Sequence, residues 1–315
     1  MKNKSTISAA MLLLTALIWG FAFVAQVEGL AFMGSLTFGG IRFAMGAFSL
    51  LPLILIFERR PGGVNIKKTL LYGLLGGVVL FCASTLQQYG IAYTQSAGKA
   101  GFITGLYTVL VPIIGIFMGR KTRPLTWLGA LAALTGLYFL SMKGGKLSFG
   151  FGDILLLIGA VFWAFHILIV DQFASQVPPL RFSITQFFVC GVLSLAGAFI
   201  FEKPSVNGIL TGWQPLLYGG IASVGVAYTL QIVGQRHVEP ARAAIIFSLE
   251  TLFAALGGVL LLHEFLGWRG YFGGALMFLG IVLAQLGART PAFSKEKRLR
   301  QKFFCFFSFK KRSDS

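Results

Sequence analysis

The segment Leu17-Ile-Trp19-Gly-Phe21 occurs twice in this chain, because Val161-Phe-Trp163-Ala-Phe165 repeats its pattern 144 residues later. Each copy lies inside an apolar run of about 17 to 25 residues, the length that crosses a bilayer core as an α-helix. Such runs follow one another over residues 7–26, 36–57, 70–90, 100–118, 125–142, 153–170, 182–201, 215–234, 242–262 and 269–288. They predict an all-α integral membrane protein with ten transmembrane helices.

The composition excludes a soluble protein. Of the 315 residues, 56% are hydrophobic and only 12% are charged, and the mean hydropathy is +0.79. A soluble domain carries roughly 25% charged residues and could not hide this much apolar surface. Disorder is excluded for the same reason. Membrane barrels alternate apolar and polar residues along each strand, whereas runs such as Ile154-Leu-Leu-Leu-Ile158 do not.

The net charge of +17 fits membrane topology better than a nucleic-acid site. Nine of the 27 basic residues follow Gly287, and most of the others lie in short breaks between apolar runs. With the N-terminus inside, the inner segments hold 12 Lys and Arg residues before the tail is counted, and the outer loops hold 5. Cytoplasmic loops are enriched in Lys and Arg. We therefore expect a cell-membrane protein with both termini in the cytoplasm.

The duplication extends along the whole membrane region. Thr85-Leu86-Gln87 matches Thr229-Leu230-Gln231, Lys99-Ala100 matches Arg242-Ala243, and all the offsets lie between 141 and 146. Each half holds five spans, and an odd number makes the second half cross the membrane in the opposite sense, as in many secondary transporters. The sequence thus predicts two inverted five-helix repeats, over 1–146 and 147–288. A basic-aromatic cytoplasmic tail follows over 289–315, and it either lies on the membrane or is disordered.

The chain resembles the EamA-like family of the drug/metabolite transporter superfamily from about residue 8 to 288. The resemblance lies in the order and spacing of its motifs: Leu17-Ile-Trp19-Gly, Arg42-Phe43, Phe247-Ser-Leu-Glu250 and Leu262-His-Glu264. It implies a secondary transporter that exports a small organic metabolite, such as an amino acid or a drug-like compound. One departure is Thr251, where many relatives carry proline. A kink is instead expected at Pro112 in the fourth span, because proline interrupts the helical hydrogen bonds.

Glu250 is the first candidate for the functional site. It follows Arg242 by eight residues, about 12 Å along a helix, which places it well inside the hydrocarbon. Ionisable groups at that depth are costly and mark substrate or proton paths, so Glu250 is a candidate for proton coupling or for binding a substrate ammonium. The alternative is a neutral or paired carboxyl within the bundle. Repeat symmetry places Tyr107 opposite Glu250, on the same helix face as Thr104 and Thr108.

Four further candidates occupy symmetric positions, and a fifth lies beside one of them. Gln87 and Gln231 can bind a polar ligand through their amides or hold helices together. Trp19 and Trp163 line a cavity, lie at the membrane interface or serve helix packing. His166, one turn beyond Trp163, is a proton relay or a hydrogen-bonded packing residue.

Arg42 lies inside the second span, about 9 Å along the helix. Its side chain can reach the outer surface from there, so we interpret it as structural, with anion binding as the alternative.

No enzyme motif is complete. His263-Glu264 begins an HExxH zinc motif, but position 267 is Gly, and no GxxxxGK[ST] sequence exists to bind a nucleotide. We therefore expect no catalytic residue, metal or cofactor. The expected partners are a small metabolite, the lipid bilayer and protons as coupling ion. Two alternatives to a midplane, alternating-access transporter stay open: a membrane-embedded enzyme acting on a lipid-linked substrate, and a channel or scaffold.

Overall fold

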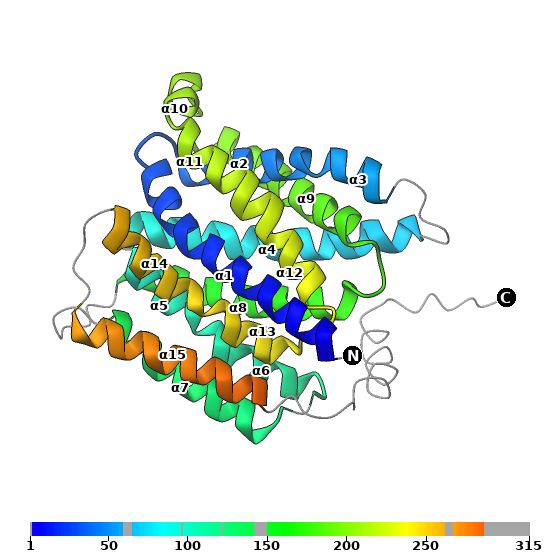
Figure 1. The fold of residues 1–315 in the computed structure, drawn as a ribbon. Helices are drawn as coiled ribbons and strands as arrows, with labels where there is room; N and C mark the ends of the chain where they lie inside the picture. The colour runs from blue at the N-terminus through cyan, green and yellow to red at the C-terminus, as the bar shows by residue number, and fades with distance from the viewer. Residues whose placement is uncertain are drawn as a thin grey trace.

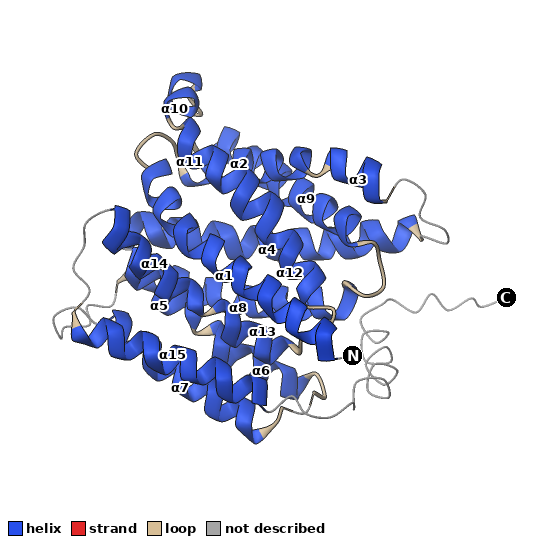
Figure 2. Ribbon diagram, in the orientation of Figure 1, coloured by secondary structure: helices blue, strands red, loops and turns tan. Residues whose placement is uncertain are grey.

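The structure is a computed structural model that describes residues 2–58, 65–95, 97–120, 122–141, 150–261 and 267–286. All regular structure in these ranges is helical (Figures 1 and 2). The elements are α1 (Lys2–Gly29), α2 (Ser35–Ser49), α3 (Leu51–Phe57), α4 (Ile66–Thr94), α5 (Ala97–Gly105), α6 (Tyr107–Phe117), α7 (Pro124–Ser141), α8 (Phe151–Phe173), α9 (Pro179–Phe201), α10 (Val206–Thr211), α11 (Trp213–Leu217), the π-helix η1 (Tyr218–Tyr228), α12 (Thr229–Gly234), α13 (Pro240–Phe247), α14 (Leu249–Leu261) and α15 (Trp268–Leu286).

The helices have the lengths and compositions of membrane spans. Within the described ranges, 8 helical stretches are long and apolar enough to cross a membrane, and two shorter apolar helices cover Pro124–Phe139 and Trp268–Ala284. These ten stretches coincide with the ten predicted runs, which confirms an all-helical membrane protein. The predicted tail and His263-Glu264 lie outside the described residues.

The outer surface is apolar, as a bilayer requires. Phe117, Phe199 and Phe201 are 78%, 75% and 77% exposed, and they belong to a large set of exposed Leu, Ile and Phe side chains. A soluble protein rarely exposes apolar patches of this extent. In the bilayer, these side chains contact lipid.

The helix contacts repeat between the two halves. α4 packs against α8 and, in the symmetric pairing, α1 packs against η1 and α12. Two other large interfaces, α2 with α9 and α7 with α15, each join corresponding spans of the two halves. Figure 1 shows α7 and α15 side by side at one edge of the bundle. The two repeats are therefore interleaved and do not form separate bundles.

Glu202, which follows α9, caps the first turn of α2. Its carboxylate accepts hydrogen bonds from the backbone N–H groups of Leu36 and Thr37, both at 2.8 Å. The first N–H groups of a helix have no partner inside the helix, and the positive end of the helix dipole favours a carboxylate there. The end of α9 is thereby fixed to the start of α2.

Glu58, which follows α3, makes the symmetric contact. Its carboxylate accepts from the backbone N–H groups of Leu180 and Arg181, at 3.0 and 3.1 Å, in the first turn of α9. Glu58 and Glu202 are 144 residues apart, like the first repeated motif. We call these two contacts the reciprocal caps. Together they fasten α2–α3 and α9 as an antiparallel pair at both ends.

The fourth and ninth spans are interrupted at equivalent places. α5 gives way to α6 at Leu106, and α13 gives way to α14 at Ser248. Both residues have nearly the same backbone angles, φ −59° with ψ −18° and φ −59° with ψ −17°. The interruption in the fourth span therefore precedes Pro112, which lies inside α6. In the ninth span it forms without proline, where the Ser248 hydroxyl donates to the Ile245 carbonyl at 2.8 Å, a local bond that bends helices.

Candidate functional site

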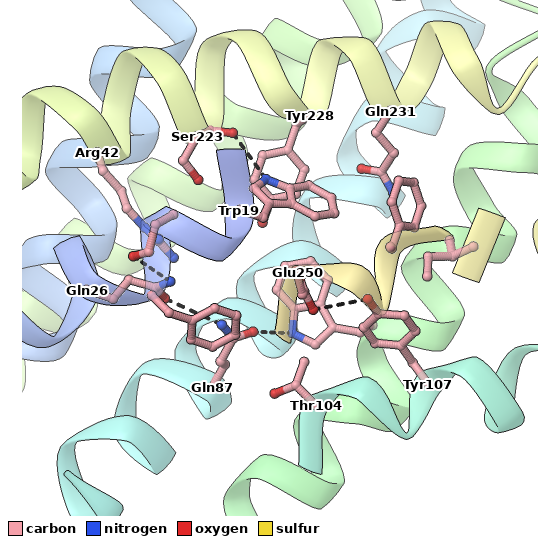
Figure 3. Close-up of a pocket in the computed structure, with 15 residues that line it drawn as sticks. Trp19, Gln26, Arg42, Gln87, Thr104, Tyr107, Ser223, Tyr228, Gln231 and Glu250 are labelled. Atoms are coloured by element: carbon pink, nitrogen blue, oxygen red, sulfur yellow. Dashed lines mark hydrogen bonds between the residues drawn. The ribbon is translucent and has the colours of Figure 1, made fainter. Parts of the chain in front are cut away.

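A pocket of about 470 Å3 lies between the two halves (Figure 3). Its wall is built by α1, α2, α4, α5, α6 and α8 together with η1, α12, α13 and α14. Six of the seven residues predicted for the site line it: Trp19, Gln87, Tyr107, Trp163, Gln231 and Glu250. Most of the residues chosen from the repeat symmetry therefore line one pocket.

Glu250 and Tyr107 meet across the pocket as the symmetry predicts. The Tyr107 hydroxyl donates to Glu250 Oε1 at 3.0 Å, and the two residues are only 3% and 5% exposed. Each stands within two residues of a helix interruption, at Leu106 and Ser248. Within the described chain no cationic side chain pairs with this carboxyl. Among the described residues, the Glu250 carboxyl therefore has a hydrogen-bond donor in Tyr107 but no ion-pair partner.

The two symmetric glutamines have different surroundings. Gln87 accepts a hydrogen bond from Trp163 Nε1 at 2.6 Å and contacts Gln26 at 3.5 Å, so its amide is part of the wall. Gln231 is 1% exposed, and neither its Oε1 nor its Nε2 has a partner among the described residues. Buried amides without partners are costly. The Gln231 amide is thus available to a ligand, whereas that of Gln87 is largely occupied.

An aromatic cluster forms another side of the pocket. The ring of Trp19 lies 4.7 Å from that of Tyr228, 5.3 Å from Phe247 and 6.4 Å from Trp163. The Trp19 indole also donates to the Ser223 carbonyl at 3.3 Å. Both tryptophans lie in the pocket wall and also pack in the buried core, so the membrane-interface alternative does not hold for this pair.

His166 is not brought to the pocket. It is fully buried, with its Nε2 3.1 Å from Gln186 Oε1, and its ring meets Trp163 edge-on at 5.9 Å between ring centroids. Its position behind Trp163 favours the packing alternative over a relay in contact with substrate.

Contrary to what its depth in the span suggested, Arg42 does not reach the outer surface. The side chain is 4% exposed and lines the pocket, and it does not extend to the outer surface. Helical rise gave its distance along the span but could not give the direction of its side chain.

Other wall residues were missed, although helical spacing points to them. Gln26 follows Trp19 by seven residues, which places both on one helix face, and Tyr228 precedes Gln231 by three. Ser223 was missed as well, whereas Thr104, which shares a helix face with Tyr107, lines the pocket beside it. In the part of the chain that the structure describes, no cluster of three or more His, Cys, Asp or Glu residues could hold a metal ion.

Comparisons with known proteins agree with this architecture. The model of the EamA-like transporter family matches residues 6–142 and again residues 150–286. An uncharacterized transporter of Archaeoglobus fulgidus is 33% identical over 87% of this chain and 84% of its own length. The uncharacterized inner membrane transporter YedA of Escherichia coli K12 is 27% identical over 86% of this chain and 88% of its own length.

A solved crystal structure has the same fold. It covers 90% of this chain and 98% of its own chain with a TM-score of 0.76, at 20% sequence identity. With two family matches that together span most of the membrane region, and with one match in each half, the protein is a multi-pass membrane transporter that belongs to the EamA-like transporter family.

Proposed function

We propose that the protein is a secondary transporter that exports a small organic metabolite by alternating access around the pocket. The observation that carries this proposal is the pocket that both halves line, next to equivalent interruptions in the fourth and ninth spans. Interrupted helices at the interface of inverted repeats are the usual place for substrate and coupling ions in such transporters. The outward direction is an inference from the family resemblance of the sequence.

The seven residues predicted from the sequence have different parts in this proposal. Glu250 is the coupling group, which takes up a proton or a substrate ammonium in one access state and releases it in the other. Gln231 and the aromatic cluster contact the substrate, while Gln87 and Tyr107 orient the groups around it. His166 supports Trp163 from behind.

The cellular setting is part of the same proposal. YedA is named as an inner membrane transporter, and the distribution of basic residues favours the cell membrane with both termini in the cytoplasm. The repeats are proposed to end at residues 146 and 288. A channel is the remaining alternative, and it would need a continuous path with selectivity rings.

The first test uses Glu250→Gln, which keeps the shape of the side chain but fixes it as neutral. Purified protein in liposomes is first screened for counterflow of labelled metabolites, because counterflow identifies a carrier and sustained ohmic current identifies a channel. If Glu250 couples protons, the variant loses accumulation driven by a pH gradient and keeps exchange. If it binds a substrate ammonium, exchange itself fails.

The matched control is Glu28→Gln, which removes an exposed carboxylate from α1. It should behave as the unmodified protein in both assays. Normal accumulation and normal exchange in Glu250→Gln would leave this carboxyl with a structural role only, and the proposed coupling would be wrong.

A further inference from the structure

Arg42 carries a buried positive charge for which the described residues provide no acidic partner. It is 4% exposed, its Nε has no hydrogen-bond acceptor, and within the described ranges no carboxylate forms an ion pair with it. Its guanidinium carbon lies 5.1 and 5.5 Å from the ring centroids of Phe43 and Phe38. Such cation–π contacts hold the group in place but leave its N–H donors without acceptors.

The other two buried arginines of the described chain are paired with acids. Arg120 lies 2.6 Å from Asp171, and Arg242 lies 4.0 Å from Glu239. An unpaired charge is costly at membrane depth. Arg42 also differs from both in its location, since it lines the central pocket.

The rest of the pocket wall offers complementary polar groups. The unpartnered amide of Gln231 and the carboxyl of Glu250 line the same cavity. In Figure 3, Arg42 and Gln231 lie on opposite sides of the pocket, with Glu250 between them in this view. A ligand that reaches from Arg42 across the cavity therefore meets these two groups.

We propose that Arg42 binds a carboxylate of the transported solute, and that the substrates are small organic acids or zwitterions. This inference rests on the proposed transport function and names its substrate class. A guanidinium presents a rigid, planar fork of donors that matches a carboxylate with two parallel hydrogen bonds. Gln231 then binds a second polar group, and a zwitterion places its ammonium against Glu250.

Charge balance favours a carboxylate over a phosphate. A carboxylate carries one negative charge, which a single arginine neutralises. A phosphate monoester carries about −1.5 to −2 charges at neutral pH. The excess negative charge would lie unpaired in the same cavity as the Glu250 carboxyl, where neighbouring charges are poorly screened.

The test uses matched pairs of probes that differ only in the carboxylate. Purified protein in detergent is titrated with acetate, butyrate, benzoate, glycine and leucine, and separately with their primary amides, at constant ionic strength. Binding is measured from the saturable rise in Tm. We expect at least one carboxylate to bind and its amide to bind at least about tenfold more weakly, the minimum that loss of a charge-assisted hydrogen bond gives.

Two variants and a control assign the effect to Arg42. Arg42→Gln should remove the preference for the carboxylate over its amide. Arg42→Lys should keep part of it, because the charge remains and the fork is lost. The control Arg269→Gln, which changes an exposed arginine outside the pocket, should bind as the unmodified protein does. If Arg42→Gln fails to fold, the comparison of acids with amides in the unmodified protein and in Arg42→Lys still decides the question.

Three results would overturn the inference: binding of none of the carboxylates, equal binding of acids and amides, or an unchanged preference in Arg42→Gln. Counterflow in liposomes separates this inference from the proposed function. A carboxylate that binds through Arg42 but is never carried across the membrane contradicts the transport function and leaves the binding site standing. A carried solute without a carboxylate contradicts the inference and leaves the transport function standing.

Discussion

Gln87 and Gln231 occupy equivalent positions in the two repeats, yet replacing them should have different effects. Gln87→Leu removes the acceptor of the Trp163 indole, and a buried donor left without a partner costs about 1–3 kcal/mol. We expect this variant to lose both thermal stability and transport. Gln231→Leu removes an amide that has no partner in the described chain, so stability should be kept or improved while transport falls.

Thermal unfolding in detergent and counterflow in liposomes measure the two quantities separately. Gln176→Leu, which changes an exposed glutamine far from the pocket, is the matched control. Unchanged transport in both the Gln87 and the Gln231 variant would show that the two amides serve packing alone.

For single residues, the sequence predicted which positions of the two repeats correspond, but it did not predict the hydrogen-bond partners of each side chain. The repeat offset paired Tyr107 with Glu250, because symmetry fixes which residues face each other across the pocket. It could not distinguish Gln87 from Gln231, since their difference comes from Trp163 and Gln26, which lie far away in the sequence. The direction of the Arg42 side chain was wrong for a related reason: helical rise gives the depth of a residue but not the side of the helix on which its side chain lies.

The reciprocal caps make a prediction at the level of whole helices. Glu58→Ala leaves the start of α9 without its carboxylate, and Glu202→Ala does the same to α2. Each substitution should cost about 0.5–2 kcal/mol of stability, as the loss of a helix cap does. The costs should add in the double variant, because the caps lie at opposite ends of the pair and distant sites act independently.

Thermal denaturation of the two single variants and the double variant tests this expectation, with Glu28→Ala as a control for loss of an exposed carboxylate. A double variant no less stable than either single one would mean that only one cap supports the pair. The caps were not predicted from the sequence, since Glu58 and Glu202 lie next to apolar runs and nothing local names their distant partners. The π-helix η1 was missed as well, because an apolar run does not show which backbone hydrogen bonds will form.

For the whole molecule, the distribution of Lys and Arg predicts the topology. Reporter fusions after Gly62 and at Ser315 should both show a cytoplasmic location, and a fusion at Gly145 should show the outside. An external reporter at Ser315 would require an odd number of spans and would contradict the inverted repeat. The sequence predicted the all-helical membrane fold, because long apolar runs without the alternation of barrel strands cross lipid as helices. The interleaving of the two halves could not be predicted, because it depends on contacts between helices that are far apart in the sequence.

The reciprocal caps also have a consequence for the order in which the two repeats can be completed during synthesis. Glu58 leaves the ribosome well before α9, so the carboxylate that caps α9 has already been synthesised when α9 forms. The first repeat has no such advantage, because Glu202 is made 166 residues after Leu36. Until then, the first turn of α2 has exposed N–H groups that only water or lipid headgroups can satisfy. The half that is synthesised first is therefore the half that is finished last.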